Sequence, residues 1–358
     1  MFSARVLKSQ RMWTWTRRAL TLLLTGVALA GAPLASSDEG GVSFWLPGNF
    51  GSLAAVPGTP GWTFAAVPYY TSVAAGADVA KSRAIEIGQY QITTVRLAAS
   101  LASTARLIFI SPSYVFETPI LGGQASVGVT WLVGDDDTSL SGTLTTSIST
   151  PPGSITRPFN ISSSISGGGD LYPLASLKWN WGVHNLMIYG MGDIPTGAYQ
   201  SNRLANLGIG HGAMDGGAGY TYLNNKNGHE FSAVAGFTYN FTNTSAQYQN
   251  GVDFHLDWGA SQFLSDRWFV GAVGYVYQQV SGDSGSGDRL GSFKSRVLGA
   301  GPQIGYLFPV GHLQGFLNLK GYWEFDAQNR PSGHNFWLVF AISPAAPAPA
   351  AQTAMDRR

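Results

Sequence analysis

The stretch His229-Glu230-Phe231-Ser232-Ala233-Val234-Ala235-Gly236-Phe237-Thr238-Tyr239-Asn240-Phe241 alternates between two kinds of residue over most of its length. Successive side chains of a β-strand point to opposite faces, so residues two apart share a face. One face of this strand would carry Phe231, Ala233, Ala235, Phe237, Tyr239 and Phe241, whereas the other is mostly polar. The stretch therefore predicts a strand that separates an apolar environment from a polar one.

The same period of two recurs along the chain. It is clear at residues 252–261 and 313–325, near 140–148, and at 171–181. Weaker alternation occurs near residues 64–73, 84–97, 105–116, 124–133, 183–192, 213–223, 268–280, 294–307 and 334–342. Together these segments predict an all-β chain of about 14 strands, within a range of about 12–16.

The connectors between these segments alternate in length. Short connectors are expected near residues 98–104, 134–139, 182, 224–228, 264–267 and 308–312. The intervening ones are mostly longer, near residues 74–83, 117–123, 149–170, 193–212, 242–249, 281–293 and 326–333. Short turns at one end and long loops at the other are typical of an antiparallel transmembrane β-barrel of the bacterial outer membrane.

The N-terminus has the pattern of a secretory signal peptide. Five basic residues precede an apolar run at residues 19–30, and small residues follow up to Ser37. This run is too short for a membrane-spanning helix, so we expect residues 1–37 to be removed after secretion. The remainder has a formal net charge of −4 and no cysteine, which argues against nucleic-acid binding and excludes disulfides, zinc fingers and thiol chemistry.

The segments that flank the expected barrel, residues 64–343, contain proline. Residues 38–63 combine Pro47, Pro57 and Pro60 with several bulky apolar side chains, so they are unsuited both to a regular strand and to water. We expect this segment to fold into or against the barrel mouth as a plug, with a disordered leader as the alternative. The Pro/Ala-rich tail at residues 344–358 is expected to be disordered.

The polar faces of the expected strands supply the candidate site. If the apolar faces meet lipid, the polar faces line a lumen, and buried charges there require partners. We expect charges of both signs to form cross-strand ion pairs. We expect the inward aromatic residues Phe316 and Tyr322 to contact an aromatic solute. The alternative is that all of these residues only stabilise the barrel. The lumen-facing candidates are Lys178, Glu230, Asp253, His255, Asp257, Phe316, Lys320, Tyr322 and Glu324.

Four local patterns admit a second interpretation. Gly208–Gly212 resembles a nucleotide-binding loop, but no helix follows it, so an in-folded loop is favoured. Asp253, His255 and Asp257 suggest a metal site, yet alternate strand residues lie about 6.6–6.8 Å apart, which favours a lumen wall. Asp135-Asp136-Asp137 falls in an expected turn, solvated or calcium-binding. Ser232, Ser261 and His255 would permit a hydrolase, but abundant serines and the absence of a G-x-S-x-G motif argue against an enzyme.

Longer stretches resemble a known family. They are Leu46–Pro57, Gly192–Tyr199, Arg203–Gly212, Tyr248–Gly251, His255–Phe263 and Asn318–Phe325. They are similar to the meta-pathway phenol-degradation family of bacterial proteins, and the resemblance covers roughly residues 40 to 345. It implies an outer-membrane protein that takes up aromatic or other hydrophobic compounds, and it brings no catalytic residues with it.

The sequence thus predicts an outer-membrane channel that admits a hydrophobic or aromatic small molecule. The alternatives are a general porin or a structural surface barrel, and an outer-membrane hydrolase is less favoured. The expected partners are outer-membrane lipid and the solute, without a cofactor, a metal or nucleic acid. The sequence does not determine the solute, the direction of transport or the oligomeric state.

Overall fold

A computed structural model describes residues 43–75, 95–149, 152–288 and 294–345, all within the structural unit Ala35–Arg358. The expected signal peptide and most of the C-terminal tail lie outside the described residues. The strands are β1 (Gly61–Ala75), β2 (Val95–Val115), β3 (Gln124–Ser149), β4 (Pro152–Trp181), β5 (His184–Asp193), β6 (Ala213–Asn224), β7 (His229–Asn240), β8 (Asp253–Phe263), β9 (Trp268–Gln279), β10 (Arg296–Val310), β11 (Leu313–Gln328) and β12 (Ser332–Pro344).

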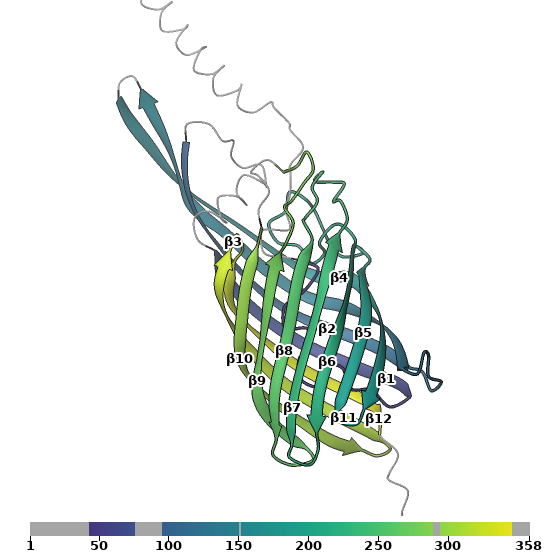
Figure 1. The fold of residues 1–358 in the computed structure, drawn as a ribbon. Coiled ribbons are helices and arrows are strands. Elements are labelled where there is room, and N and C mark those ends of the chain that lie inside the picture. The colour runs from purple at the N-terminus through teal and green to yellow at the C-terminus, as the bar shows by residue number, and fades with distance from the viewer. Residues whose placement is uncertain (1–42, 76–94, 150–151, 289–293, 346–358) are drawn as a thin grey trace, which may run out of the picture. The chain divides into compact units, whose positions relative to one another are not determined.

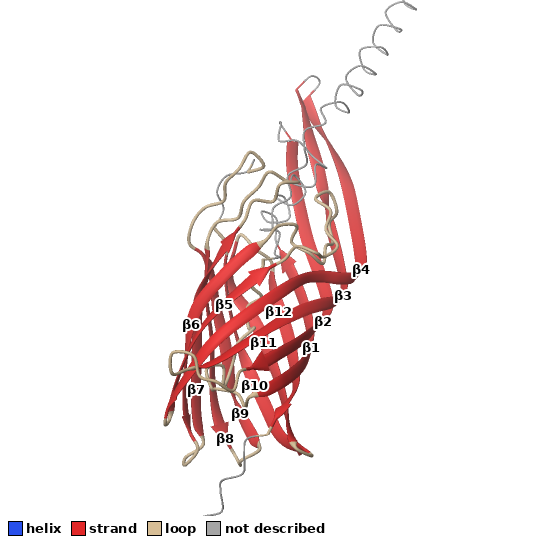
Figure 2. Cartoon of the chain, turned by 90° about the vertical axis from the view of Figure 1, so that its right-hand side faces the viewer, coloured by secondary structure: helices blue, strands red, loops and turns tan. Residues whose placement is uncertain are grey.

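The twelve strands form one closed antiparallel barrel (Figure 1). Each strand pairs with its neighbours in sequence, and β1 closes the barrel by pairing with β12 from Phe64↔Ile342 to Ala74↔Ser332. Closure leaves no free sheet edge around the wall, which satisfies the backbone without help from solvent. Figure 2 shows the same wall turned by 90°, with strands joined by loops and no helix among the described residues. Within the described residues, no helix is long and apolar enough to cross a membrane.

The outward face of the barrel is apolar. Along β7 the large exposed hydrophobic side chains are Phe231, Phe237 and Tyr239, whereas the polar residues Glu230, Ser232 and Thr238 are buried. On β8 the buried residues are likewise Asp253, His255 and Asp257. A water-soluble barrel would have the opposite arrangement, so the sequence-based assignment of faces is confirmed.

Exposed aromatic side chains concentrate near both ends of the wall. At the end where the chain enters β1 they include Trp62, Phe64, Trp181 and Trp268, and the Trp268 ring stacks on Tyr306 at 4.2 Å between centroids. Near the opposite end the exposed aromatics are Tyr70, Trp131, Phe237, Tyr239, Trp323 and Phe325. Two aromatic girdles around an apolar band are the surface pattern of membrane-spanning barrels.

The twelve strands are fewer than the expected number of about 14 and lie at the lower limit of the expected range of 12–16. Two expected strands, 124–133 and 140–148, form the single strand β3, and the expected strand 84–97 overlaps β2 at residues 95–97, while its residues 84–94 lie outside the described residues. Residues 98–104 and 134–139 continue β2 and β3, and residues 152–170 belong to β4 instead of a long loop. Serine, glycine and aspartate normally indicate turns. Here they lie where β2, β3 and β4 extend beyond the band of exposed apolar residues, so an outward apolar face is not required.

The expected difference between the two ends is confirmed for most connectors. Residues 182–183, 225–228, 264–267 and 311–312 are short turns at one end, whereas 194–212, 241–252 and 280–295 are longer loops at the other. Three connectors are exceptions: 116–123 is longer and lies at the end with short turns, whereas 150–151 and 329–331 are short and lie at the end with long loops. Figure 1 shows the longer loops gathered at one barrel mouth.

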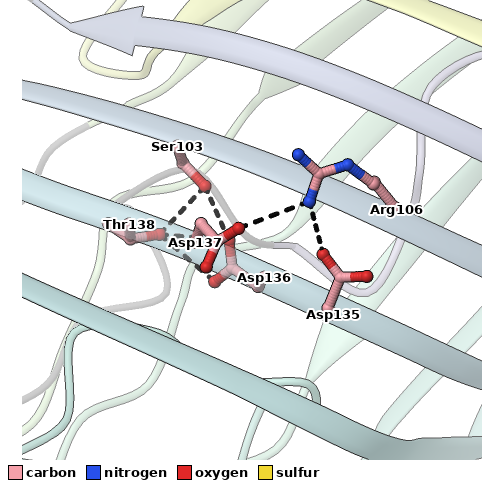
Figure 3. Close-up of polar contacts among 6 residues, drawn as sticks. All are labelled: Ser103, Arg106, Asp135, Asp136, Asp137 and Thr138. Atoms are coloured by element: carbon pink, nitrogen blue, oxygen red, sulfur yellow. Dashed lines mark hydrogen bonds and ion pairs between the residues drawn. The ribbon is translucent and has the colours of Figure 1, made fainter.

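The three consecutive aspartates lie in β3, so their expected turn is also wrong. Asp135 and Asp137 point outward, where Arg106 Nη1 on β2 donates to them at 2.7 and 3.3 Å (Figure 3). Asp136 points inward and accepts hydrogen bonds from Ser103 at 2.9 Å and from Thr138 at 3.1 Å. The alternation of a strand therefore divides the triplet between two separate polar clusters.

Candidate functional site

The segment Ser43–Pro60, which precedes β1, lies inside the barrel. Phe44, Trp45 and Ala55 are 4%, 1% and 0% exposed, and the segment contacts inward-facing side chains from strands on several sides of the wall. Residues 43–60 contain no regular strand or helix, as their prolines predict, but residues 61–63 of the expected segment 38–63 belong to β1, and residues 38–42 lie outside the described residues. The barrel interior is therefore occupied by polar side chains that meet a loop.

Two opposite charges hold the centre of this segment. Asp257 accepts the backbone N–H groups of Gly48 and Phe50, both at 3.0 Å. Lys320 Nζ donates to the carbonyl oxygens of the same two residues at 2.6 and 3.2 Å. Buried backbone groups need such partners, and charged partners give stronger hydrogen bonds than neutral ones.

Gly48 fits this position because it has no side chain. Its φ is +91°, a conformation that L-residues rarely adopt. A Cβ atom there would lie 2.9 Å from the Tyr322 ring and 3.2 Å from the Trp337 indole nitrogen. The glycine thus lets the backbone lie directly against the lumen wall between Asp257 and Lys320.

Further polar side chains hold the following turn. The N–H of Leu53 donates to Glu230 Oε1 at 2.9 Å, and the N–H of Ala55 donates to Thr221 Oγ1 at 3.0 Å. Lys178 Nζ donates to the Val56 carbonyl oxygen at 3.3 Å. Because these contacts are made to the backbone, they depend on the path of the segment more than on its side chains.

Trp45 is the side chain that fixes the other end of the segment. Its indole stacks on the His255 imidazole, with 3.5 Å between ring centroids and 12° between ring planes. His255 Nε2 is 2.8 Å from Asp215 Oδ2 and 3.3 Å from the Tyr189 hydroxyl, and Thr238 donates to the same aspartate oxygen. This buried network joins β5, β6, β7 and β8 beneath Trp45.

Described residues line a cavity on each side of the segment. The upper cavity, of about 160 Å³, lies towards the long loops and has a largely apolar wall that includes Leu46, Leu101, Leu107, Leu132, Tyr172, Leu204, Leu207 and Ile209. The lower cavity, of about 320 Å³, lies towards the short turns and has a mixed wall of apolar residues and small polar ones, among them Thr59, Thr63, Ser111, Ser113, Ser126 and Ser176. Phe50 borders the lower cavity and Leu46 and Pro47 border the upper one.

The loop 194–212 covers the upper cavity. Asp170, at the end of the extended part of β4, accepts the N–H groups of Gly197 at 2.6 Å and Ile209 at 2.9 Å. A Cβ atom on Gly208 would lie 2.9 Å from the Asp170 carboxylate, which explains glycine at this position. The glycine-rich motif therefore serves the in-folded loop that the sequence favours.

A family model described as "Putative MetA-pathway of phenol degradation" matches residues 96–340, well over half of the chain. The chain belongs to this family. The match confirms the resemblance that the sequence motifs indicate, and it extends from the start of β2 to within β12. No curated protein matches the chain.

Three solved structures were compared with this family member, all at low sequence identity. The COG4313 outer membrane channel from Pseudomonas putida F1 is 14% identical, with a TM-score of 0.59, over 84% of this chain and 100% of that one. A FadL homologue from Pseudomonas aeruginosa is 11% identical with a TM-score of 0.37, over 79% and 89% of the two chains. The toluene transporter TbuX from Ralstonia pickettii is 8% identical with a TM-score of 0.32, also over 79% and 89%. The first score indicates a shared barrel fold, and the two lower scores do not.

The predicted lumen residues separate into two groups in this family member. Lys178, Glu230, Asp257 and Lys320 hold the N-terminal segment, while His255 and Tyr322 pack against it. Asp253, Glu324 and Phe316 lie elsewhere on the inner wall, where they contact Asn240 at 2.9 Å, Tyr275 at 2.9 Å and the Phe269 ring at 6.3 Å. The expected cross-strand pairing of charges is replaced, at the segment, by bonds to its backbone.

The alternative sites of the sequence analysis do not assemble. His255 hydrogen-bonds to Asp215 and Tyr189, while Ser232 donates to Glu230 and Ser261 contacts Ser52 at 2.8 Å, so the described residues contain no Ser–His pair here. Asp253, His255 and Asp257 each have different protein partners. Their separation along β8 prevents them from converging on one ion.

Several residues of the site were missed from the sequence. Tyr189 and Asp215 lie on strands with weak alternation, although their parity within β5 and β6 would have placed them on the inner face. The leucines of the upper cavity were not among the sequence candidates, which were taken from the polar faces of the expected strands. Leu132 is an apolar residue on the inward face of β3, and Leu204 and Leu207 lie in a loop.

Proposed function

We propose that this protein is an outer-membrane channel for a small hydrophobic or aromatic molecule, with residues 43–60 as a plug in its lumen. The apolar outward face between two aromatic girdles supports insertion in a membrane, because polar groups inside the closed wall are shielded from lipid. Family membership and the fold shared with an outer membrane channel support the same location.

The size and lining of the upper cavity carry the proposal for the solute. An apolar cavity of about 150 Å³ holds benzene in a well-studied protein core. The upper cavity has about 160 Å³ and a wall rich in leucine, with Tyr172 among its aromatic members. A single aromatic ring therefore fits it in volume and in chemistry.

The lower cavity provides the way out. Its serines and threonines can bind water, so a solute that leaves the upper cavity would pass into a compartment that is less apolar and can be hydrated. Residues 47–50 separate the two cavities, and their bonds to Asp257 and Lys320 hold the separation in place. Movement of this turn would join the cavities into one path along β1–β4.

The test is uptake of radiolabelled toluene by a deletion strain that carries the wild-type chain or Leu132→Trp. Leu132 is 4% exposed and lines the upper cavity, so the larger ring fills space that the solute needs. We expect saturable uptake by the wild type and about a ten-fold lower rate for the variant, since overfilling a cavity removes its volume.

Val133→Trp is the matched control, because residue 133 lies next to Leu132 on the outward face of β3 and does not line the cavity. Uptake at the wild-type rate is expected for this control. Equal uptake by Leu132→Trp and the wild type would contradict the proposal. Efficient passage of small sugars through the wild type would favour a general porin instead.

A further inference from the structure

The lower cavity is lined by a lysine that has no anionic partner in the described part of the chain. Lys178 lies on the inward face of β4, and its Nζ atom makes a single hydrogen bond there, to the Val56 carbonyl oxygen at 3.3 Å. Lys320 differs, because it has the opposite charge of Asp257 nearby. None of the described residues that line the lower cavity is acidic. An ammonium group has three donors, so two donors of Lys178 are left for water or a ligand.

The neighbours of Lys178 on the two adjacent strands differ in polarity. The strand register places Gln124 of β3 directly opposite Lys178 on one side and Met187 of β5 opposite it on the other, and all three residues line the lower cavity. Among the described residues, the side-chain amide of Gln124 has no hydrogen-bond partner, so its N–H groups can act as further donors. One row further in, Ser126 and Ser176 extend the polar side of the wall, with 2.8 Å between their Oγ atoms.

The apolar side of the lower cavity suits an aromatic ring. It includes Phe50, Leu174 and Met187, and the Phe50 ring meets the Tyr189 ring edge-on with 5.2 Å between centroids. The volume of about 320 Å³ is roughly twice that of an apolar cavity that holds benzene, so a ring with an attached carboxylate fits. The carboxylate of such a molecule can accept hydrogen bonds from an ammonium and an amide together.

We propose that the lower cavity is a binding site for a small aromatic carboxylate, whose negative charge is held by Lys178 and Gln124. The site goes beyond the proposed channel, because it assigns a charged class of ligand to a cavity that a neutral solute would only cross. The ligand supplies the anionic partner that the described residues do not give Lys178, and a charge withdrawn from water needs such a partner. An inorganic anion would pair with the lysine but make no use of the apolar side of the wall.

The test is isothermal titration calorimetry of the full chain purified in detergent, with benzoate as the ligand and benzyl alcohol as its neutral counterpart. We expect benzoate to bind more tightly than benzyl alcohol. Lys178→Met should weaken benzoate binding about 10- to 100-fold, as for one lost hydrogen bond to a charged group, whereas Lys178→Arg keeps the charge and should retain binding. Gln124→Leu leaves the bonds to the N-terminal segment intact and should weaken benzoate binding about 2- to 10-fold.

Lys226→Met is the matched control, because Lys226 is exposed in the turn 225–228 and does not line the cavity, and it should bind benzoate like the wild type. Folding is checked by the gel migration of unheated and heated protein, and Gln124→Leu carries the test if Lys178→Met does not fold.

Three results would overturn the carboxylate site. They are no binding of benzoate to the wild type, equal affinities of the wild type for benzoate and benzyl alcohol, and unchanged benzoate binding in folded Gln124→Leu. An equal loss of both ligands in Lys178→Met would also overturn it, since the lysine would then only hold the N-terminal segment. The channel is tested separately by toluene uptake, so it can stand or fall without this site.

Discussion

The two sides of the lumen differ in the size of their inward-facing side chains. The wall of β6, β7, β8 and β11 carries Asp215, Glu230, Asp257 and Lys320, together with His255, and these residues fill the interior with the N-terminal segment. The wall of β1–β4 carries mostly small or apolar inward residues, such as Ser103, Ala105, Ser113 and Ser126, and both cavities lie against it. Long polar side chains thus hold the plug mainly on one side, with Lys178 of β4 as a further contact, and short side chains such as Ser113 leave space on the other.

The largest effect is expected from removal of the plug. Deletion of residues 43–58 removes most of the N-terminal segment, including the turn that lies between the two cavities. We expect single-channel conductance in planar bilayers to increase several-fold, because a twelve-stranded barrel is wider than the eight-stranded barrels that side chains nearly fill. Conductance equal to that of the wild type would mean that these residues do not block the lumen.

Arginine substitutions test both the outward face of the barrel and the inward face of the wall formed by β6, β7, β8 and β11. Ala235→Arg places a charge on the outward face of β7, which costs about 2–4 kcal/mol at the bilayer midplane. Thr238→Arg is expected to be at least as disruptive, because Thr238 is fully buried and donates to Asp215.

Ser113→Arg is the control on the open side, since it projects into the lower cavity. The measurement is the yield of folded barrel after refolding into lipid vesicles. If Thr238→Arg folds as well as Ser113→Arg, the two sides of the lumen are not different.

Asp257→Asn tests the hydrogen bonds that hold the plug in the lumen. The substitution removes the charged acceptor of two backbone N–H groups and leaves Lys320 without its nearby opposite charge. Hydrogen bonds to charged groups contribute about 1.5–3 kcal/mol each, so the plug should open more often. We expect frequent opening events in single-channel recordings of this variant. Asp253→Asn should open as rarely as the wild type, because Asp253 contacts Asn240 of the barrel wall.

The smallest effect is expected where β2 and β3 extend beyond the apolar band of the barrel. Arg106→Gln removes the exposed ion pairs with Asp135 and Asp137, and solvent screens such pairs strongly. The melting temperature should change at the edge of detection, and uptake should not change. A large loss of stability would mean that the outward charges brace this extension of the sheet.

The sequence alone was sufficient for the all-β class, the inward and outward faces and the family. These properties follow from a period of two, which each strand records independently of its neighbours, as in residues 229–241. The strand number was less accessible, because Asp135–Asp137 and the serine-rich segments of β2, β3 and β4 resemble turns. Whether such a polar segment is a turn or a strand depends on where the apolar band of the barrel ends, and a local sequence pattern does not show this position.

The tertiary structure decided which polar residues meet. The sequence placed Asp257 and Lys320 on inward faces, but their shared partners, Gly48 and Phe50, are more than 200 residues away along the chain. The cavities were equally inaccessible, because Leu132, Leu204 and Leu46 form one wall only after the barrel closes and two separate loops fold into its mouth. Alternation determines which face a residue occupies, whereas closure of the barrel determines what it faces across the lumen.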